Sequence, residues 1–260
     1  MKNEAKLGKR PGLFISNSRF YILALSVAFS LVITSYLRLN IFSDTLFEIR
    51  LQQVFGFTAL SLWYIALLAT PLSGLLGKKG WMAQYLYARR AIGVSGAYFA
   101  VLHVLLGVFG QLGGPGNLLN LPSRFQQSLI FGAFGLTVLV LMASTSFDRV
   151  IKWLTFPRWK WLHRLSYPAI TLVLLHVWII GTHLDSLRFR VIILGAISIL
   201  VVLESWRISK NIEKASKSDD PKLRLLVFIS MVLILIGLSV YIPRSMDRYH
   251  AKHTGMEGHK

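Results

Sequence analysis

Residues 91–110 read AIGVSGAYFAVLHVLLGVFG, a stretch with no charged side chain and a single histidine, His103. A helix of about 17–25 apolar residues can cross the hydrocarbon core of a bilayer. A second apolar stretch, residues 165–182, contains His176. A side chain that titrates near neutral pH is costly in hydrocarbon, so a histidine within a membrane span indicates a functional site. His103 and His176 are therefore the first candidate functional residues.

The composition of the whole chain is that of an integral membrane protein. Of its 260 residues, 54% are hydrophobic and 15% are charged, whereas soluble domains carry about 25% charged residues. We therefore predict an all-α polytopic membrane helix bundle, with a six-helix core and a seventh span. The sixth apolar run is short and needs Leu187 and Phe189 to cross the bilayer. The apolar runs are residues 20–37, 55–74, 91–110, 129–146, 165–182, 191–206 and 225–242.

Lysine and arginine alternate between rich and poor connecting segments along the chain. The segments that precede the first, third, fifth and seventh spans hold 20 of the 29 basic residues. Cytoplasmic loops carry the excess of basic residues, so we expect a cytoplasmic N-terminus. The same placement accounts for the net charge of +18, which anionic lipid would attract. The basic residues form no single patch, so nucleic acid is not an expected partner.

His103 and His176 lie at similar depths in two spans that run in the same direction. His103 follows Arg90, the last basic residue before its span, by 13 residues, and His176 follows Arg164 by 12. At a rise of 1.5 Å per residue, both imidazoles stand about 18–20 Å above the inner boundary. Two level histidines on parallel helices can bind one metal ion from opposite sides. We therefore predict a bis-histidine haem b between them.

Small residues share the face of the third span that carries His103. Small side chains at these intervals would leave a groove beside the histidine that a flat macrocycle could occupy. The alternative is that they let two helices pack closely, as is common in membranes. These residues are Gly96, Ala100, Gly107 and Gly110.

His163 lies at the membrane edge, in the sequence Trp161-Leu162-His163-Arg164. It precedes His176 by about 20 Å of helix, so it could serve a second haem nearer the cytoplasm. At that level the third span offers Arg89 and Arg90 rather than a histidine. A contact to a quinone or FMN, a haem bound on one side, and simple interfacial anchoring stay open.

The remaining histidines and the inner arginines have weaker assignments. His183 is expected at the outer surface, and His250, His253 and His259 in a solvated tail. The arginines at the inner face could contact haem propionates, a quinone head group or lipid phosphate. These arginines are Arg89, Arg90 and Arg164.

The sequence also excludes several other cofactors from this chain. The absence of cysteine excludes thiolate haem ligation and iron–sulfur clusters. No phosphate-binding glycine loop occurs, so a nicotinamide or flavin would belong to a partner. The expected divisions are a cytoplasmic segment 1–19, a haem-binding bundle 20–206, a basic cytoplasmic loop 207–224, an additional span 225–242 and a polar tail 243–260.

Three short motifs carry a resemblance to a known family. They are ARRAIG at 88–93 leading to LH at 102–103, then WLHRLSY at 161–167, and LHVW at 175–178. They resemble the ferric-reductase-like transmembrane domain family, and within it most the haem-binding membrane subunits of bacterial periplasmic methionine-sulfoxide reductase systems. The likeness runs over about residues 55–206. It implies a six-helix core that binds haem b through His103, His163 and His176 and moves electrons across the membrane.

The predicted function is that of a membrane cytochrome b. It would accept electrons on the cytoplasmic side from quinol or a reduced flavoprotein and pass them through haem to an acceptor outside, such as a periplasmic or extracellular reductase. Two axial histidines suit outer-sphere electron transfer rather than substrate binding. One alternative is a terminal reductase of ferric chelates or oxygen. Another is a transporter or scaffold without haem.

Overall fold

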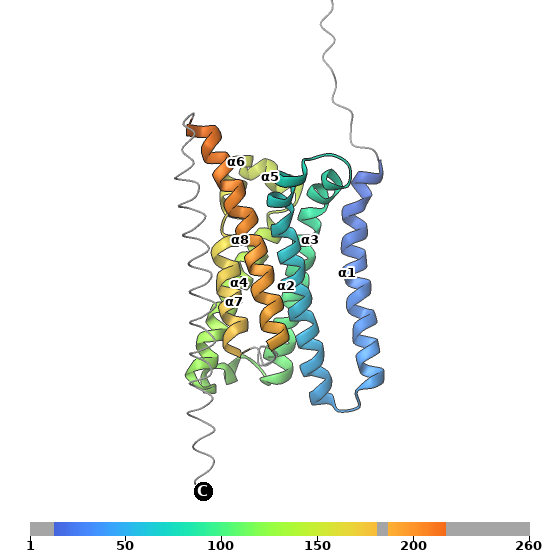
Figure 1. Ribbon diagram of the computed structural model, residues 1–260. Helices are drawn as coiled ribbons and strands as arrows, with labels where there is room; N and C mark the ends of the chain where they lie inside the picture. The colour runs from blue at the N-terminus through green and yellow to red at the C-terminus, as the bar shows by residue number, and fades with distance from the viewer. Residues whose placement is uncertain (1–12, 181–186, 217–260) are drawn as a thin grey trace, which may run out of the picture. The chain divides into compact units, whose positions relative to one another are not determined.

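The computed structural model describes residues 13–180 and 187–216, and these residues contain helices and turns but no strand (Figure 1). The predicted seventh span at 225–242 and His183, His250, His253 and His259 lie outside the described residues. The long helices are α1 (Leu13–Asn40), α2 (Asp44–Leu76), α3 (Trp81–Leu105), α4 (Ser123–Ser144), α7 (Ser166–Ile180) and α8 (Leu187–Ser216), and the short ones are η1 (Leu106–Gln111), η2 (Pro115–Asn120), α5 (Asp148–Leu154) and α6 (Phe156–His163).

Six helical segments in the described part of the chain are long and apolar enough to cross a membrane. Each contains all or most of one of the first six apolar runs, so the prediction of an all-α polytopic bundle is confirmed. The sixth segment includes Leu187 and Phe189, which its short apolar run needs in order to cross the bilayer. The segments are Arg19–Asn40, Asp44–Leu76, Trp81–Gln111, Ser123–Ser144, Phe156–Ile180 and Leu187–Lys210.

The described helices fall into two compact units, and each unit is held together by contacts among its own residues. The first unit includes residues 13–69 and 78–180, and the second includes residues 70–77 and α8. In the first unit α1 packs against α3, α3 against α4, and α4 against α7. In the second unit the Trp206 ring lies beside Gly74, and Arg207 forms an ion pair with Glu204 at 2.6 Å.

Phe99 of α3 is the centre of the hydrophobic core in the first unit. Its side chain is 1% exposed. Its ring centroid lies 5.6 Å from that of Phe55, 6.0 Å from that of Phe29 and 5.2 Å from that of Tyr98. These edge-on and tilted contacts join α1, α2 and α3, because aromatic pairs favour such geometries. The core therefore fixes the helix that carries His103.

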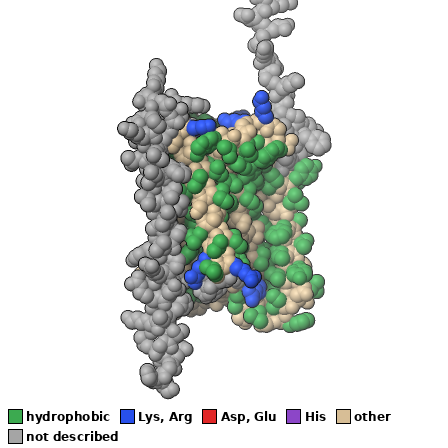
Figure 2. Space-filling view, in the orientation of Figure 1, with side chains coloured by type: hydrophobic (Ala, Val, Ile, Leu, Met, Phe, Trp, Pro, Cys, Tyr) green, Lys and Arg blue, Asp and Glu red, His purple; other side chains and the backbone are tan. Residues whose placement is uncertain are grey.

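Hydroxyl groups also join α1 to α3. Ser26 donates to the Ser95 hydroxyl at 2.8 Å, and the Ser30 and Tyr98 hydroxyls lie 2.8 Å apart. Between membrane helices, small polar side chains allow close approach and provide hydrogen bonds that lipid cannot. The other face of α1 exposes large apolar side chains such as Phe20. On the face that Figure 2 shows, hydrophobic side chains cover the middle and Lys and Arg side chains lie toward the ends.

Two breaks in the helices have a clear local cause. Gly113 and Gly114 have φ angles of 66° and 122°, which residues with a Cβ rarely adopt, and they end the third membrane segment. Thr155 has a φ angle of 66° and separates α5 from α6. The sequence did not predict α5 and α6, which lie between the fourth and fifth apolar runs.

Candidate haem-binding site

The structure brings His103 of α3 and His176 of α7 together inside the first unit. Their ring centroids lie 6.4 Å apart, and the ring planes are inclined by 85°. They reach this point from helices far apart in the sequence, because α4 packs against both α3 and α7. The pairing that the equal depths predicted is therefore present as a spatial arrangement.

The separation of the two rings fits a metal ion between them. A metal–imidazole bond is about 2 Å long and the ring centre lies about 1.2 Å beyond the nitrogen, so two opposed ligands have ring centres about 6.4 Å apart. This estimate equals the 6.4 Å observed for His103 and His176. The donor set, two neutral imidazoles in an apolar bundle, suits the iron of a b-type haem.

Hydrogen bonds fix which nitrogen of each ring is available. The Nδ1 atom of His103 lies 2.9 Å from the Gln52 carbonyl oxygen, and that of His176 lies 2.9 Å from the Ser128 carbonyl oxygen. A carbonyl oxygen can only accept, so each Nδ1 carries the proton. Each Nε2 atom is then left with a lone pair. Donation from Nδ1 also raises the basicity of the ring as a ligand.

Gln52 and Ser128 are functional residues that the sequence analysis missed. Ser128 is 0% exposed, and its hydroxyl donates to the His176 carbonyl at 3.0 Å. The Gln52 side chain accepts from Gln111, the last residue of η1. Both residues bind the Nδ1–H group of a histidine through a backbone carbonyl, which every residue type has, and the Ser128 hydroxyl also lies 3.2 Å from the Nδ1 atom of His176. No side-chain pattern could have identified these two carbonyl groups.

The small residues beside His103 serve helix packing. A Cβ atom on Gly96 would lie 3.4 Å from the Ala59 carbonyl oxygen, and one on Gly107 would overlap the Gln52 side chain. A Cβ atom on Gly110 would lie 2.9 Å from the Glu48 carboxylate, and Ala100 packs against the core around Phe99. The predicted groove for a macrocycle along these four residues is therefore wrong, because α2 and the core occupy that face.

His163 lies apart from the other two histidines, at the end of α6. Its Nδ1 atom donates to the Trp159 carbonyl at 3.0 Å, and its ring centroid lies 4.1 Å from that of Trp159. The nearby charges include Arg89 and Arg90. Residues 13–180 and 187–216 contain three histidines, and the other two already face each other. No second histidine pair therefore forms within the described residues.

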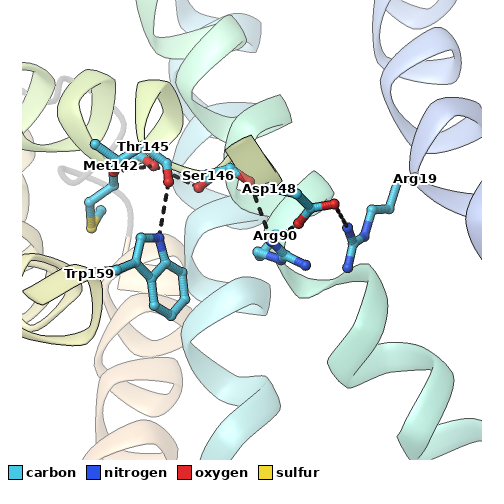
Figure 3. Close-up of polar contacts among 7 residues, drawn as sticks. All are labelled: Arg19, Arg90, Met142, Thr145, Ser146, Asp148 and Trp159. Atoms are coloured by element: carbon cyan, nitrogen blue, oxygen red, sulfur yellow. Dashed lines mark hydrogen bonds and ion pairs between the residues drawn. The ribbon is translucent and has the colours of Figure 1, made fainter. Parts of the chain in front are cut away.

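Arg90, one of the three arginines singled out in the sequence, belongs to a polar cluster around Asp148 (Figure 3). Arg90 donates to the Asp148 carboxylate at 2.7 Å, and Arg19 lies 3.6 Å from it. These contacts join α1, α3 and α5. Close by, the Trp159 indole N–H donates to the Thr145 carbonyl at 3.1 Å. Arg90, a candidate for propionate or lipid contacts, thus has a protein partner, while Arg164 is an exposed residue at the end of α6.

We expect the Asp148 cluster to stabilise the protein at neutral pH and to lose this effect in acid. The hydrogen bond from Arg90 lowers the pKa of Asp148 below its usual value. A carboxyl group with a lowered pKa stabilises the fold above its unfolded pKa of about 3.9 and stops doing so as the pH falls through its folded pKa. The effect should be small, because the Asp148 side chain is 68% exposed.

The measurement is thermal unfolding of the detergent-solubilised protein between pH 3 and pH 8. Wild type should unfold at a higher temperature than Asp148→Asn at neutral pH, and the difference should shrink as the pH falls toward and below about 4. Asp44→Asn is a matched control, since Asp44 binds Arg38 at an exposed site in the α1–α2 turn. A difference that does not depend on pH would contradict the assignment.

Comparisons with known proteins agree with the motifs. Residues 55–174 match the family model of the ferric reductase like transmembrane component. The protein-methionine-sulfoxide reductase heme-binding subunit MsrQ of Ralstonia nicotianae (strain ATCC BAA-1114 / GMI1000) is 31% identical over 125 residues. The match covers 47% of this chain and 55% of that protein, so the chain spans about half the length of the relative. The resemblance to the ferric-reductase-like family is confirmed over this segment.

Proposed function

We propose that this chain, through its ferric-reductase-like segment 55–174, is a membrane cytochrome b that binds haem between His103 and His176 and carries electrons across the membrane. The main observation in support of this proposal is that the His103 and His176 ring centroids lie 6.4 Å apart. The name of the relative supports the same cofactor, since that protein is called a heme-binding subunit.

The residues around the site suit electron transfer rather than binding of a substrate to the iron. When bound, haem would supply one-electron chemistry, and His103 and His176 would hold its iron. The carbonyl groups of Gln52 and Ser128 hold both imidazoles in one orientation, so little needs to move when the charge changes. The protein fixes the position and ligand basicity of the cofactor.

The donor and the acceptor belong to partners in this proposal. Electrons would come from quinol or a reduced flavoprotein at the cytoplasmic side and leave to a reductase outside. The relative is named as a subunit for a methionine-sulfoxide reductase, which supports an acceptor of that class. We also propose that the N-terminus is cytoplasmic, on the basis of the basic-residue bias, and that the membrane is a bacterial inner membrane, on the basis of the resemblance to the Ralstonia protein. His163, with Arg89, Arg90 and Arg164, is proposed to contact a quinone or FMN at the inner end.

The test of this function is electron transfer across a sealed bilayer. The full-length protein, loaded with haem, is reconstituted into liposomes that contain ferricyanide, dithionite is added outside, and an ionophore removes the membrane potential. We expect the internal ferricyanide to be reduced at least about tenfold faster than in empty liposomes or in liposomes with His103→Ala. This ratio corresponds to a difference of about 1.4 kcal/mol or more in apparent activation free energy. Normal reduction of the haem without reduction of the enclosed ferricyanide would contradict a transmembrane conductor.

A further inference from the structure

Two glycines face the proposed haem ligands at unusually short range. A Cβ atom on Gly56 of α2 would lie 2.8 Å from the Nδ1 atom of His103. A Cβ atom on Gly132 of α4 would lie 2.9 Å from the Nδ1 atom of His176. In each case the three atoms nearest to that Cβ position all belong to the histidine ring. Any larger residue at either position would displace an imidazole.

The two glycines occupy the same place relative to the carbonyl groups that bind the rings. Gly56 follows Gln52 by four residues, and Gly132 follows Ser128 by four residues. In an α-helix the carbonyl of one residue points toward the N–H of the residue four positions later. The side chain at that later position therefore stands beside the carbonyl oxygen. A ring from a neighbouring helix can reach the oxygen only where this side chain is absent.

We propose that Gly56 and Gly132 are positioning residues for the two haem ligands. Because each glycine has no side chain, it leaves a gap on the surface of its helix, which we call a notch. Through this notch an imidazole Nδ1–H reaches the helix carbonyl oxygen four residues earlier. This inference rests on the proposed haem site, and it extends that site from two histidines to two histidine–carbonyl–glycine units. One unit lies between α2 and α3, and the other lies between α4 and α7.

Ordinary helix packing does not account for these two glycines. Gly96, which does serve helix packing, lies closest to backbone and aliphatic atoms of α2, among them the Ala59 carbonyl oxygen. Gly135, one turn after Gly132 on α4, faces the Val173 side chain. Gly56 and Gly132 instead meet ring atoms alone within the three nearest contacts. Their role is thus specific to the imidazoles.

The proposal predicts a change in ligand strength when either notch is filled. An alanine would push the ring off the carbonyl and weaken or break the bond from Nδ1. Loss of such an outer hydrogen bond commonly lowers metal affinity by about 10- to 100-fold. It also lowers the basicity of the ligand, which favours ferrous over ferric iron. We therefore expect Gly56→Ala and Gly132→Ala to retain less haem and to raise the midpoint potential of the haem that stays bound.

The experiment compares these two variants with Gly93→Ala in the full-length protein. A Cβ atom on Gly93 would lie 3.9 Å from the Ala66 Cβ atom, an ordinary contact, so the control should match wild type. Haem content per protein and the midpoint potential from a redox titration are measured for all four proteins. Wild-type haem content and potential in both notch variants would overturn the inference while leaving the haem site intact.

A measurement on wild type covers the case in which the variants do not fold. Nitrogen-15 NMR of histidine-labelled protein, in the diamagnetic ferrous state or without haem, reports which ring nitrogen carries the proton. We expect His103 and His176 to be protonated at Nδ1 and hydrogen-bonded there. Protonation at Nε2 in either residue would overturn the inference. Absence of haem from wild type would instead contradict the proposed function, and the nitrogen-15 result would still decide the role of the notches.

Discussion

Replacement of either His103 or His176 with alanine is expected to remove the α band of b-type haem from the dithionite-reduced minus oxidised spectrum. The two rings face each other with centroids 6.4 Å apart, so each variant leaves the iron with one protein ligand in an apolar bundle. Haem affinity should fall at least as far as for loss of an outer hydrogen bond, about 10- to 100-fold. The spectra are recorded on membranes from cells supplied with haem, at matched protein levels.

His163→Ala is the matched comparison for these variants. The His163 ring lies tilted against the Trp159 ring, and its Nδ1 atom donates to the Trp159 carbonyl at 3.0 Å, so it lies apart from His103 and His176. We expect this variant to keep part or all of the α band. A full α band in His103→Ala would show that the ligand pair has been wrongly assigned.

The membrane fold could be predicted from the sequence because its signal is strong. A helix must satisfy its own backbone hydrogen bonds in lipid, so each apolar run long enough to cross predicts a span. The depth of His103 and His176 followed from the fixed rise of a helix. Their ring centroids lie 6.4 Å apart inside the first unit, so equal depth in two spans was sufficient to predict that the two residues lie close together.

The surroundings of the pair could not be predicted in the same way. The carbonyl groups of Gln52 and Ser128 are backbone atoms, so their role depends on how α2 and α4 pack. Glycine spacing is ambiguous, because the same residue type permits helix packing at Gly96 and approach of a ring at Gly56. The ion pair between Arg90 and Asp148 could not be predicted either, because the two residues are 58 positions apart in the sequence.

The segment between α4 and α7 shows a further limit of prediction from hydropathy. Residues 147–164 lie between the fourth and fifth apolar runs, where no helix was predicted, and most of them form α5 and α6. These helices are short, carry both aromatic and basic side chains, and leave Trp153 and Trp161 exposed. Such mixed composition is typical of the membrane interface, where tryptophan and basic residues gather. A hydropathy window averages over this pattern and cannot distinguish a short interfacial helix from a loop.

Electron paramagnetic resonance of the ferric wild-type protein tests most directly whether His103 and His176 bind one haem iron between them. The imidazole planes of His103 and His176 are inclined by 85°. Perpendicular axial imidazoles leave two iron d orbitals nearly equal in energy, which produces a low-spin signal of high anisotropy. We predict this signal in haem-loaded wild type and its loss in both His103→Ala and His176→Ala. A high-spin ferric signal in wild type would contradict this proposed ligation, because it would mean that at least one of the two histidines does not bind the iron.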